Sequence, residues 1–173
     1  MPSGRTHDRI TLWSLPWVAG LALWLTRSSH FTAIIASGYL FSGLMFGPDL
    51  DIRSAQYKRW GWLRWLWLPY QKSLRHRSRW SHGLLLGTTL RIFYLLGILV
   101  IASLFTIVVV ELLSDRPHDW LRLLLDFAQR LVHHRFEAIA LFLGLEAGAM
   151  SHACADWLGS TWKRTKRQHR RPR

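Results

Sequence analysis

Long apolar runs alternate with short basic segments along this chain, and the runs have the lengths of membrane-crossing helices. Residues 92–110 carry no charge over nineteen positions, which is enough to cross a hydrocarbon core of about 30 Å at about 1.5 Å per residue. Residues 31–47 are also uncharged, whereas residues 11–26 are shorter and contain Pro16. Because only four residues separate these last two runs, they predict a tight helical hairpin.

A fourth apolar run covers residues 136–158, and ionisable groups interrupt it at Glu137, Glu146, His152 and Asp156. Charged side chains within a membrane are costly and usually functional. Together the four runs predict an all-α integral membrane protein with about four transmembrane helices and additional interfacial amphipathic helices.

Two further segments are predicted to lie along a membrane surface. In residues 120–134 the polar side chains recur at i, i+4, i+7, i+8 and i+11, which places them on one helix face opposite a Leu/Phe face. A helix packed against the other spans would show the same pattern, so both interpretations stand. Residues 57–72 mix four tryptophans with basic residues, which is typical of an anchor in anionic lipid headgroups. A surface that stacks nucleic-acid bases is the less favoured interpretation.

The composition favours a membrane protein with basic loops. Of the 173 residues, 50% are hydrophobic, yet the formal net charge is +13, and there are eleven tryptophans. Tryptophan concentrates at membrane–water interfaces. The single cysteine, Cys154, excludes an internal disulfide and a cysteine-rich zinc module. We predict one helical transmembrane domain over residues 1–158 and a basic, disordered tail over residues 159–173.

The basic residues predict which side of the membrane each loop faces. In a four-span arrangement, 18 of the 23 lysines and arginines lie in the N-terminal segment, the loop of residues 48–91 and the tail. Lysine and arginine favour the cytoplasmic side, so both termini and this loop are predicted to be cytoplasmic. Three spans would place the tail and the loop on opposite sides. A signal peptide over residues 1–30 is disfavoured, because no small-x-small cleavage site follows the apolar run.

Two aspartates, Asp49 and Asp51, come directly after the Gly47-Pro48 sequence that ends the second apolar run. Pro48 lacks an N–H and disfavours helix at the residue before it. If the next residues are extended, the two carboxylates point to the same side, because strand-like side chains alternate. A polar cap at the membrane–water boundary explains the pair equally well.

Other imidazoles and carboxylates are predicted to converge on the same membrane face. His152 and Asp156 are four residues apart and share a helix face. His76 and His82 are six apart, so a turn or a helix start must bring them together. With a histidine that precedes the first run, the candidate metal ligands come from four regions of the chain: His7, Asp49, Asp51, His76, His82, His152 and Asp156.

This set of side chains predicts a divalent transition metal. Imidazole and carboxylate together suit zinc, which we favour, and also manganese or iron. Seven ligands exceed what one tetrahedral ion needs, so we predict one or two ions. A pair of divalent ions would also offset the repulsion among the three carboxylates.

The segments that carry these residues also carry a family resemblance. The sequences MPSGRTHDR, FGPDLDI, SLRHRSRWSHG and SHACADWLGS resemble the uncharacterised metal-binding integral membrane proteins common in cyanobacteria, over nearly the whole chain. The motifs alone are distantly similar to inner-membrane proteins that are predicted metal-dependent hydrolases. The resemblance implies a His/Asp metal site formed by the seven residues named above, and it implies no settled reaction.

Two functions fit this chemistry. The first is a metal-dependent hydrolase at the cytoplasmic face that acts on a phosphoester or lipid-like substrate, because a bound metal activates water and arginine forks match phosphate. Arg77 is the candidate catalytic residue that clamps phosphate, although its charge also fits positive-inside topology alone. The alternative is a non-catalytic scaffold, assembly factor or sensor with a structural metal. Ion transport is disfavoured, because the one deep ionisable group, Glu146, lies off the helix face of His152.

Overall fold

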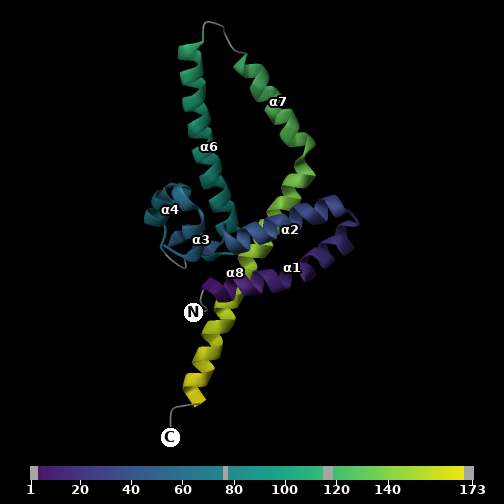
Figure 1. Cartoon of the computed structure of the whole chain (residues 1–173), viewed down its shortest axis with the longest axis vertical. Helices are drawn as coiled ribbons and strands as arrows, with labels where there is room; N and C mark the ends of the chain where they lie inside the picture. The colour runs from purple at the N-terminus through teal and green to yellow at the C-terminus, as the bar shows by residue number, and fades with distance from the viewer. Residues whose placement is uncertain (1–3, 76–77, 115–118, 170–173) are drawn as a thin grey trace.

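The computed structural model describes residues 4–75, 78–114 and 119–169, and this part of the chain is helical and contains no strand. Figure 1 shows the first two helices as a hairpin that runs across the last helix, while a long helix rises from a group of short ones. In chain order the elements are α1 (Gly4–Thr26), α2 (Ser29–Leu44), the 3₁₀ helix η1 (Pro48–Asp51), α3 (Ala55–Arg59), the 3₁₀ helix η2 (Gly61–Trp67), α4 (Leu68–Ser73), α5 (Arg79–His82), α6 (Leu86–Leu113), α7 (Trp120–His133) and α8 (Arg135–His169).

Three segments of the described chain are long and apolar enough to cross a membrane: Ser29–Asp51, Leu86–Leu113 and Arg135–Thr161. They correspond to three of the four apolar runs. The remaining run, residues 11–26, lies in α1, which is helical through Pro16 but is not one of the three. We expected about four spans. By length and composition, the described residues contain three segments that could cross a membrane.

Helices α2 and α8 pack against each other at glycines. A methyl group on Gly144 would lie 2.3 Å from the carbonyl oxygen of Ile35, and one on Gly148 would lie 2.5 Å from that of Tyr39. Two small residues four apart on one helix face allow two helix backbones to approach closely. The hydroxyl of Tyr39 also donates a hydrogen bond of 3.1 Å to Ser151 Oγ. This contact fixes the face that α8 presents to the rest of the fold.

The short helices after α2 form the aromatic core. Residues 57–72 are therefore only in part available as a surface anchor. Trp67 has no exposed area and packs against Phe46, Tyr70 and the partly buried Trp60. Trp62 and Trp65 are exposed. Alternating tryptophans in a sequence do not reveal which of them a tertiary contact removes from the surface, so the anchor prediction now concerns only the exposed pair.

Helices α6 and α7 extend away from this core (Figure 1). None of the most apolar stretch of α6 is buried, as expected for a helix that needs lipid around it. No residue of α7 is buried, so its Leu/Phe face is not packed against the described parts of the chain. After α7, the final helix α8 continues as far as His169 and thus into the segment that was expected to be a disordered tail.

Candidate metal centre

The described residues bring six of the seven predicted ligands to one place. His7 lies in the first turns of α1, Asp49 and Asp51 in η1, His82 at the end of α5, and His152 and Asp156 on one face of α8. The seventh, His76, and the candidate phosphate clamp, Arg77, lie outside the described residues. Four elements that are distant in the sequence therefore supply imidazoles and carboxylates to one site.

One group of candidate ligands consists of His7, His152 and Asp156, whose donor atoms all lie within 4.8 Å of one another. His7 Nε2 lies 3.3 Å from Asp156 Oδ1, and the two imidazole rings stack with their centroids 3.9 Å apart. Both histidines are buried. Three donors at this spacing, two imidazoles and one carboxylate, form a common zinc-binding set.

A second group consists of Asp49, His82 and Asp156, again with donor atoms within 4.8 Å. It shares Asp156 with the first group. Asp49 also links the two groups, because its Oδ2 lies 3.2 Å from His152 Nε2 and its Oδ1 lies 3.8 Å from His82 Nε2. Asp49 and Asp156 thus lie between the His7–His152 pair and His82. This arrangement fits two nearby cations.

Several donor atoms of this site are buried and have no hydrogen-bond partner among the described residues: His7 Nδ1, Asp49 Oδ1, both ring nitrogens of His152, and Asp156 Oδ1. A buried polar atom without a partner costs about 1–3 kcal/mol, and more when the group is charged. Asp49 Oδ1, His152 Nε2 and Asp156 Oδ1 have His–Asp approaches of 3.2–3.8 Å in place of hydrogen bonds. A divalent cation would satisfy them, so the residues present fit a metal.

The environment of His7 also suits a metal ligand. Burial lowers the pKa of His7 below its usual value, and the neighbouring His152 lowers it further, although Asp156 and Asp49 act in the opposite direction. A lower pKa keeps the imidazole neutral near pH 7. Neutral imidazole is the form that coordinates a metal.

Asp51 lies beside the two groups rather than in either of them. The sequence suggested that residues 49–51 are extended and that both carboxylates face one side, but Pro48 is the first residue of a 3₁₀ turn. With about three residues per turn, side chains two apart point in different directions. Asp49 therefore faces His82 Nε2, whereas Asp51 Oδ2 lies 3.7 Å from Nδ1 of the same ring. A carboxylate on the second ring nitrogen is the usual orienting partner of a metal-bound histidine.

A cavity of about 230 Å³ opens beside the first group of candidate ligands. Its wall includes His7, Asp49, His152 and Asp156 together with small or apolar residues of α1, α2, the start of α3 and the segment before α3. Gln56 also lines it; its amide N–H donates a hydrogen bond of 2.9 Å to the carbonyl of Gly43, and its buried Oε1 has no partner among the described residues. The site is therefore open on one side to a molecule larger than water.

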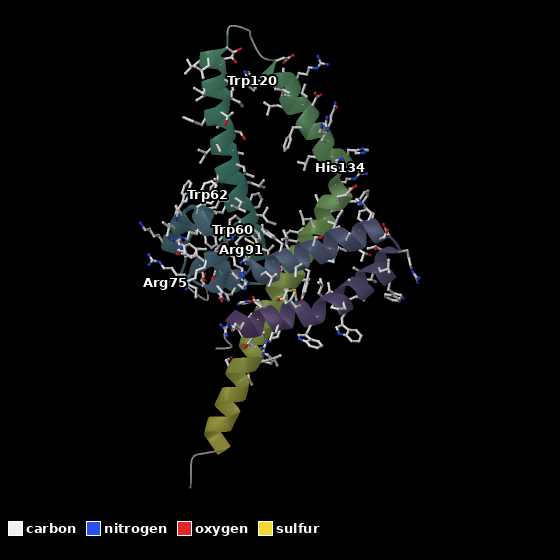
Figure 2. The ribbon with its side chains drawn as sticks, in the orientation of Figure 1. Trp60, Trp62, Arg75, Arg91, Trp120 and His134 are labelled. Atoms are coloured by element: carbon white, nitrogen blue, oxygen red, sulfur yellow. The ribbon has the colours of Figure 1, made fainter. Side chains whose placement is uncertain are left out.

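No lysine or arginine among the described residues lines this cavity. Arg59 lies outside the wall and donates two hydrogen bonds to the carboxylate of Asp8, which lines the cavity. That pairing raises the pKa of Arg59. Arg75 is exposed, and Figure 2 shows it at the outer edge of the short helices.

Sequence reasoning missed three polar residues that the structure places around the site. Gln56 showed no signal at all. Arg91 was counted only as a topological charge, although a buried arginine at the start of the most apolar helix is unusual. Glu146 was set aside because it lies off the helix face of His152, although its position inside the Gly144–Gly148 pair indicated a buried helix contact.

The comparisons with known proteins agree with a metal site. A protein of Aquifex aeolicus (strain VF5), described only as an uncharacterized protein, is 41% identical over 59 residues. That alignment covers 34% of this chain and 41% of the Aquifex protein, so the chain spans less than half the length of this relative. No solved structure matches the chain.

The model of one protein family matches residues 2–166, a stretch that contains all seven predicted ligands. The family is described as "Uncharacterized metal-binding protein (DUF2227)". This confirms the resemblance to a metal-binding family, whereas the membrane, cyanobacterial and hydrolase parts of that resemblance remain predictions. The chain belongs to this family of metal-binding proteins.

Proposed function

We propose that this protein is an integral membrane, metal-dependent hydrolase whose His/Asp cluster holds two divalent ions, with zinc as the favoured metal. The observation that carries the proposal is the set of buried donor atoms from α1, η1 and α8 that make no hydrogen bond within the described chain. Without cations, the three carboxylates in this space would repel one another.

The two groups of candidate ligands support two ions rather than one. Each group supplies three donor atoms, and Asp156 belongs to both. Asp49 directs one oxygen toward His152 and the other toward His82. In this proposal His7 and His152 hold one ion, His82 holds the other, and the two carboxylates lie between them.

Bound divalent ions would lower the pKa of a coordinated water molecule and neutralise charge on an ester oxygen. The residues of the chain contribute the geometry, because the stacked His7 and His152 rings hold each other in place.

The substrate class that we propose is a phosphoester or a similar membrane-associated ester. The cavity wall is largely apolar and carries no basic side chain among the described residues, so the cations themselves would attract an anionic group. An apolar wall beside a charged centre suits a substrate with a polar head and an apolar body. Arg77 remains our candidate for a phosphate clamp from the loop that precedes His82.

The proposed site faces the cytoplasm. Eighteen of the 23 lysines and arginines lie in the segments that surround it in sequence, the N-terminal segment, the 48–91 loop and the tail. Such an excess marks the cytoplasmic side. Exposed Trp62 and Trp65 would then contact anionic lipid headgroups on the same side.

The test of catalysis uses the full chain in detergent, stripped with a chelator and reloaded with zinc or manganese. We expect hydrolysis of a chromogenic phosphomonoester, a phosphodiester or a phospholipid in mixed micelles, with a loss of about 100-fold or more in Asp156→Asn, because this residue serves both groups. His133→Gln, at an exposed position of α7, is the matched control and should keep full activity.

A structural metal site is the second candidate function, since the same ligands would tie four elements together. Full metal loading with no hydrolysis of any of these substrates would contradict the enzymatic proposal and favour the structural one. In that case metal removal should lower the melting temperature, and no hydrolysis should be seen with or without the metal.

A further inference from the structure

The turn that follows His82 has an unfavourable backbone conformation. Leu85 has φ = 60°, in the left-handed region that side chains other than glycine rarely adopt. The N–H of Leu86 also bonds the carbonyl of Leu84 at 2.6 Å, which is a very tight turn. A backbone of this kind persists only when surrounding groups hold it. We therefore asked which side chains hold the segment of residues 81–86.

The first of these side chains is Arg91, which is 1% exposed. Its Nη1 donates a hydrogen bond of 3.0 Å to the carbonyl of Ser81, and its Nη2 donates one of 3.0 Å to Thr88 Oγ1. Figure 2 shows Arg91 where α6 meets α2 and the short helices. Gly87 permits the close approach, because a methyl group there would lie 2.5 Å from the oxygen of Ser81.

The second is Glu146 on α8, which is 6% exposed. Its Oε1 accepts a hydrogen bond of 2.8 Å from the N–H of Leu85, the residue with the unfavourable φ. Glu146 lies six residues before His152, or about 9 Å along the helix axis. Helix α8 thus supplies ligands to the proposed centre directly and also holds the turn that follows His82.

The two contacts hold the backbone on either side of His82. Ser81, whose carbonyl Arg91 binds, also places its Oγ 2.9 Å from His82 Nδ1. Asp51 lies 3.7 Å from the same nitrogen, and Arg91 interacts electrostatically with both Asp51 and Glu146. The positive charge of Arg91 is therefore attracted to both carboxyl groups, and hydrogen bonds from Arg91 and Glu146 end on the backbone on either side of His82.

A purely structural role for Arg91 and Glu146 would be to join α6 to α8 inside the membrane. The Glu146 bond does reach the N-cap residue of α6, Leu85, but it ends on the backbone of the turn and not on an α6 side chain. Each of the two residues bonds the backbone of the segment 81–86, on either side of His82, and no hydrogen bond joins the two side chains to each other among the described contacts. The contacts are those of a clamp on a ligand-bearing turn.

We propose that Arg91 and Glu146 are positioning residues that fix His82 for the second metal ion. The proposal rests on the proposed metal function of the cluster. Fixing a ligand in place before the metal binds raises affinity, and loss of such outer contacts typically costs about 10- to 100-fold in metal affinity.

The test compares Glu146→Gln, which keeps an acceptor oxygen for the Leu85 N–H, with Glu146→Leu, which does not. Cobalt(II) titration of the full chain in detergent, followed by visible absorption, should show two equivalents in the wild type and in Glu146→Gln. Glu146→Leu should lose about 10-fold or more in affinity at one equivalent only. It should cause no further loss in a His82→Ala background, because both changes act on the same ion.

A second measurement does not depend on metal. In the chelator-stripped protein, diethyl pyrocarbonate should modify His82 several-fold faster in Glu146→Leu than in Glu146→Gln, while His152 is unaffected. Unchanged His82 reactivity, or equal weakening of both cobalt equivalents, would overturn the positioning role. If the wild type binds no cobalt but His82 is still modified faster in Glu146→Leu than in Glu146→Gln, the metal function is overturned and the positioning of His82 is retained.

Discussion

At the scale of single residues, two aspartates only two positions apart have different surroundings. Asp49 directs one oxygen toward His152 and the other toward His82 Nε2, whereas Asp51 lies against His82 Nδ1. The cause is the 3₁₀ turn that begins at Pro48, since an extended segment would have pointed both carboxylates the same way. We therefore assign Asp49 to the metals and Asp51 to the orientation of His82.

This assignment predicts that two equivalent substitutions have unequal effects. Asp49→Asn removes a charged donor of the second group that also lies 3.2 Å from His152 of the first, so we expect the loss of at least one equivalent of zinc. Asp51→Asn leaves the donor atoms in place, so both equivalents should remain, with affinity about 10- to 100-fold weaker at one of them. Competition with a chromophoric chelator measures both quantities. Equal loss in the two variants would show that both carboxylates coordinate metal.

At the scale of elements, α8 is the helix on which the site is assembled. It carries His152 and Asp156 on one face, and Gly144 and Gly148 set its distance from α2. The packing of these glycines therefore controls how closely Asp156 approaches His7 of α1 and how Asp49, just after α2, meets His152.

A methyl group at one of these glycines should separate the two helices. In Gly148→Ala the new carbon would lie 2.5 Å from the carbonyl oxygen of Tyr39 and 2.7 Å from Ser42 Cβ, and overpacking of this kind costs about 1–3 kcal/mol. We expect a lower melting temperature in detergent and weaker zinc binding. Gly97→Ala on α6 is the matched control, because nothing lies within 4 Å of the added carbon. A Gly148→Ala protein as stable as Gly97→Ala would contradict the proposed helix contact.

The elements themselves could largely be predicted from the sequence. Long uncharged runs at residues 31–47 and 92–110 indicated helices because a long apolar segment has few other stable forms, and the His152–Asp156 spacing placed both side chains on one face. The fate of Trp67 could not be predicted, because burial depends on contacts with Phe46 and Tyr70 that lie elsewhere in the chain. The roles of Arg91 and Glu146 could not be predicted for the same reason. Arg91 bonds Ser81, ten residues earlier, and Glu146 bonds Leu85, sixty-one residues earlier.

At the scale of the whole molecule, one site joins the beginning, the middle and the end of the chain. α1, η1, α5 and α8 contribute candidate ligands, and α6 contributes the arginine that holds the turn after α5. The remaining apolar surface of α6 and α7 is exposed, as expected for segments surrounded by lipid. Metal binding by the cluster would therefore stabilise the arrangement of the whole fold as well as form the site.

The most direct test is elemental analysis of the full chain purified in detergent, beside His152→Ala and the control His133→Ala. We predict two equivalents of a divalent transition metal, with zinc favoured, in the wild type and in His133→Ala. His152→Ala should lose at least one equivalent, because His152 faces both His7 and Asp49. A wild type that holds no metal, even after reloading with zinc, manganese or iron, would contradict the account.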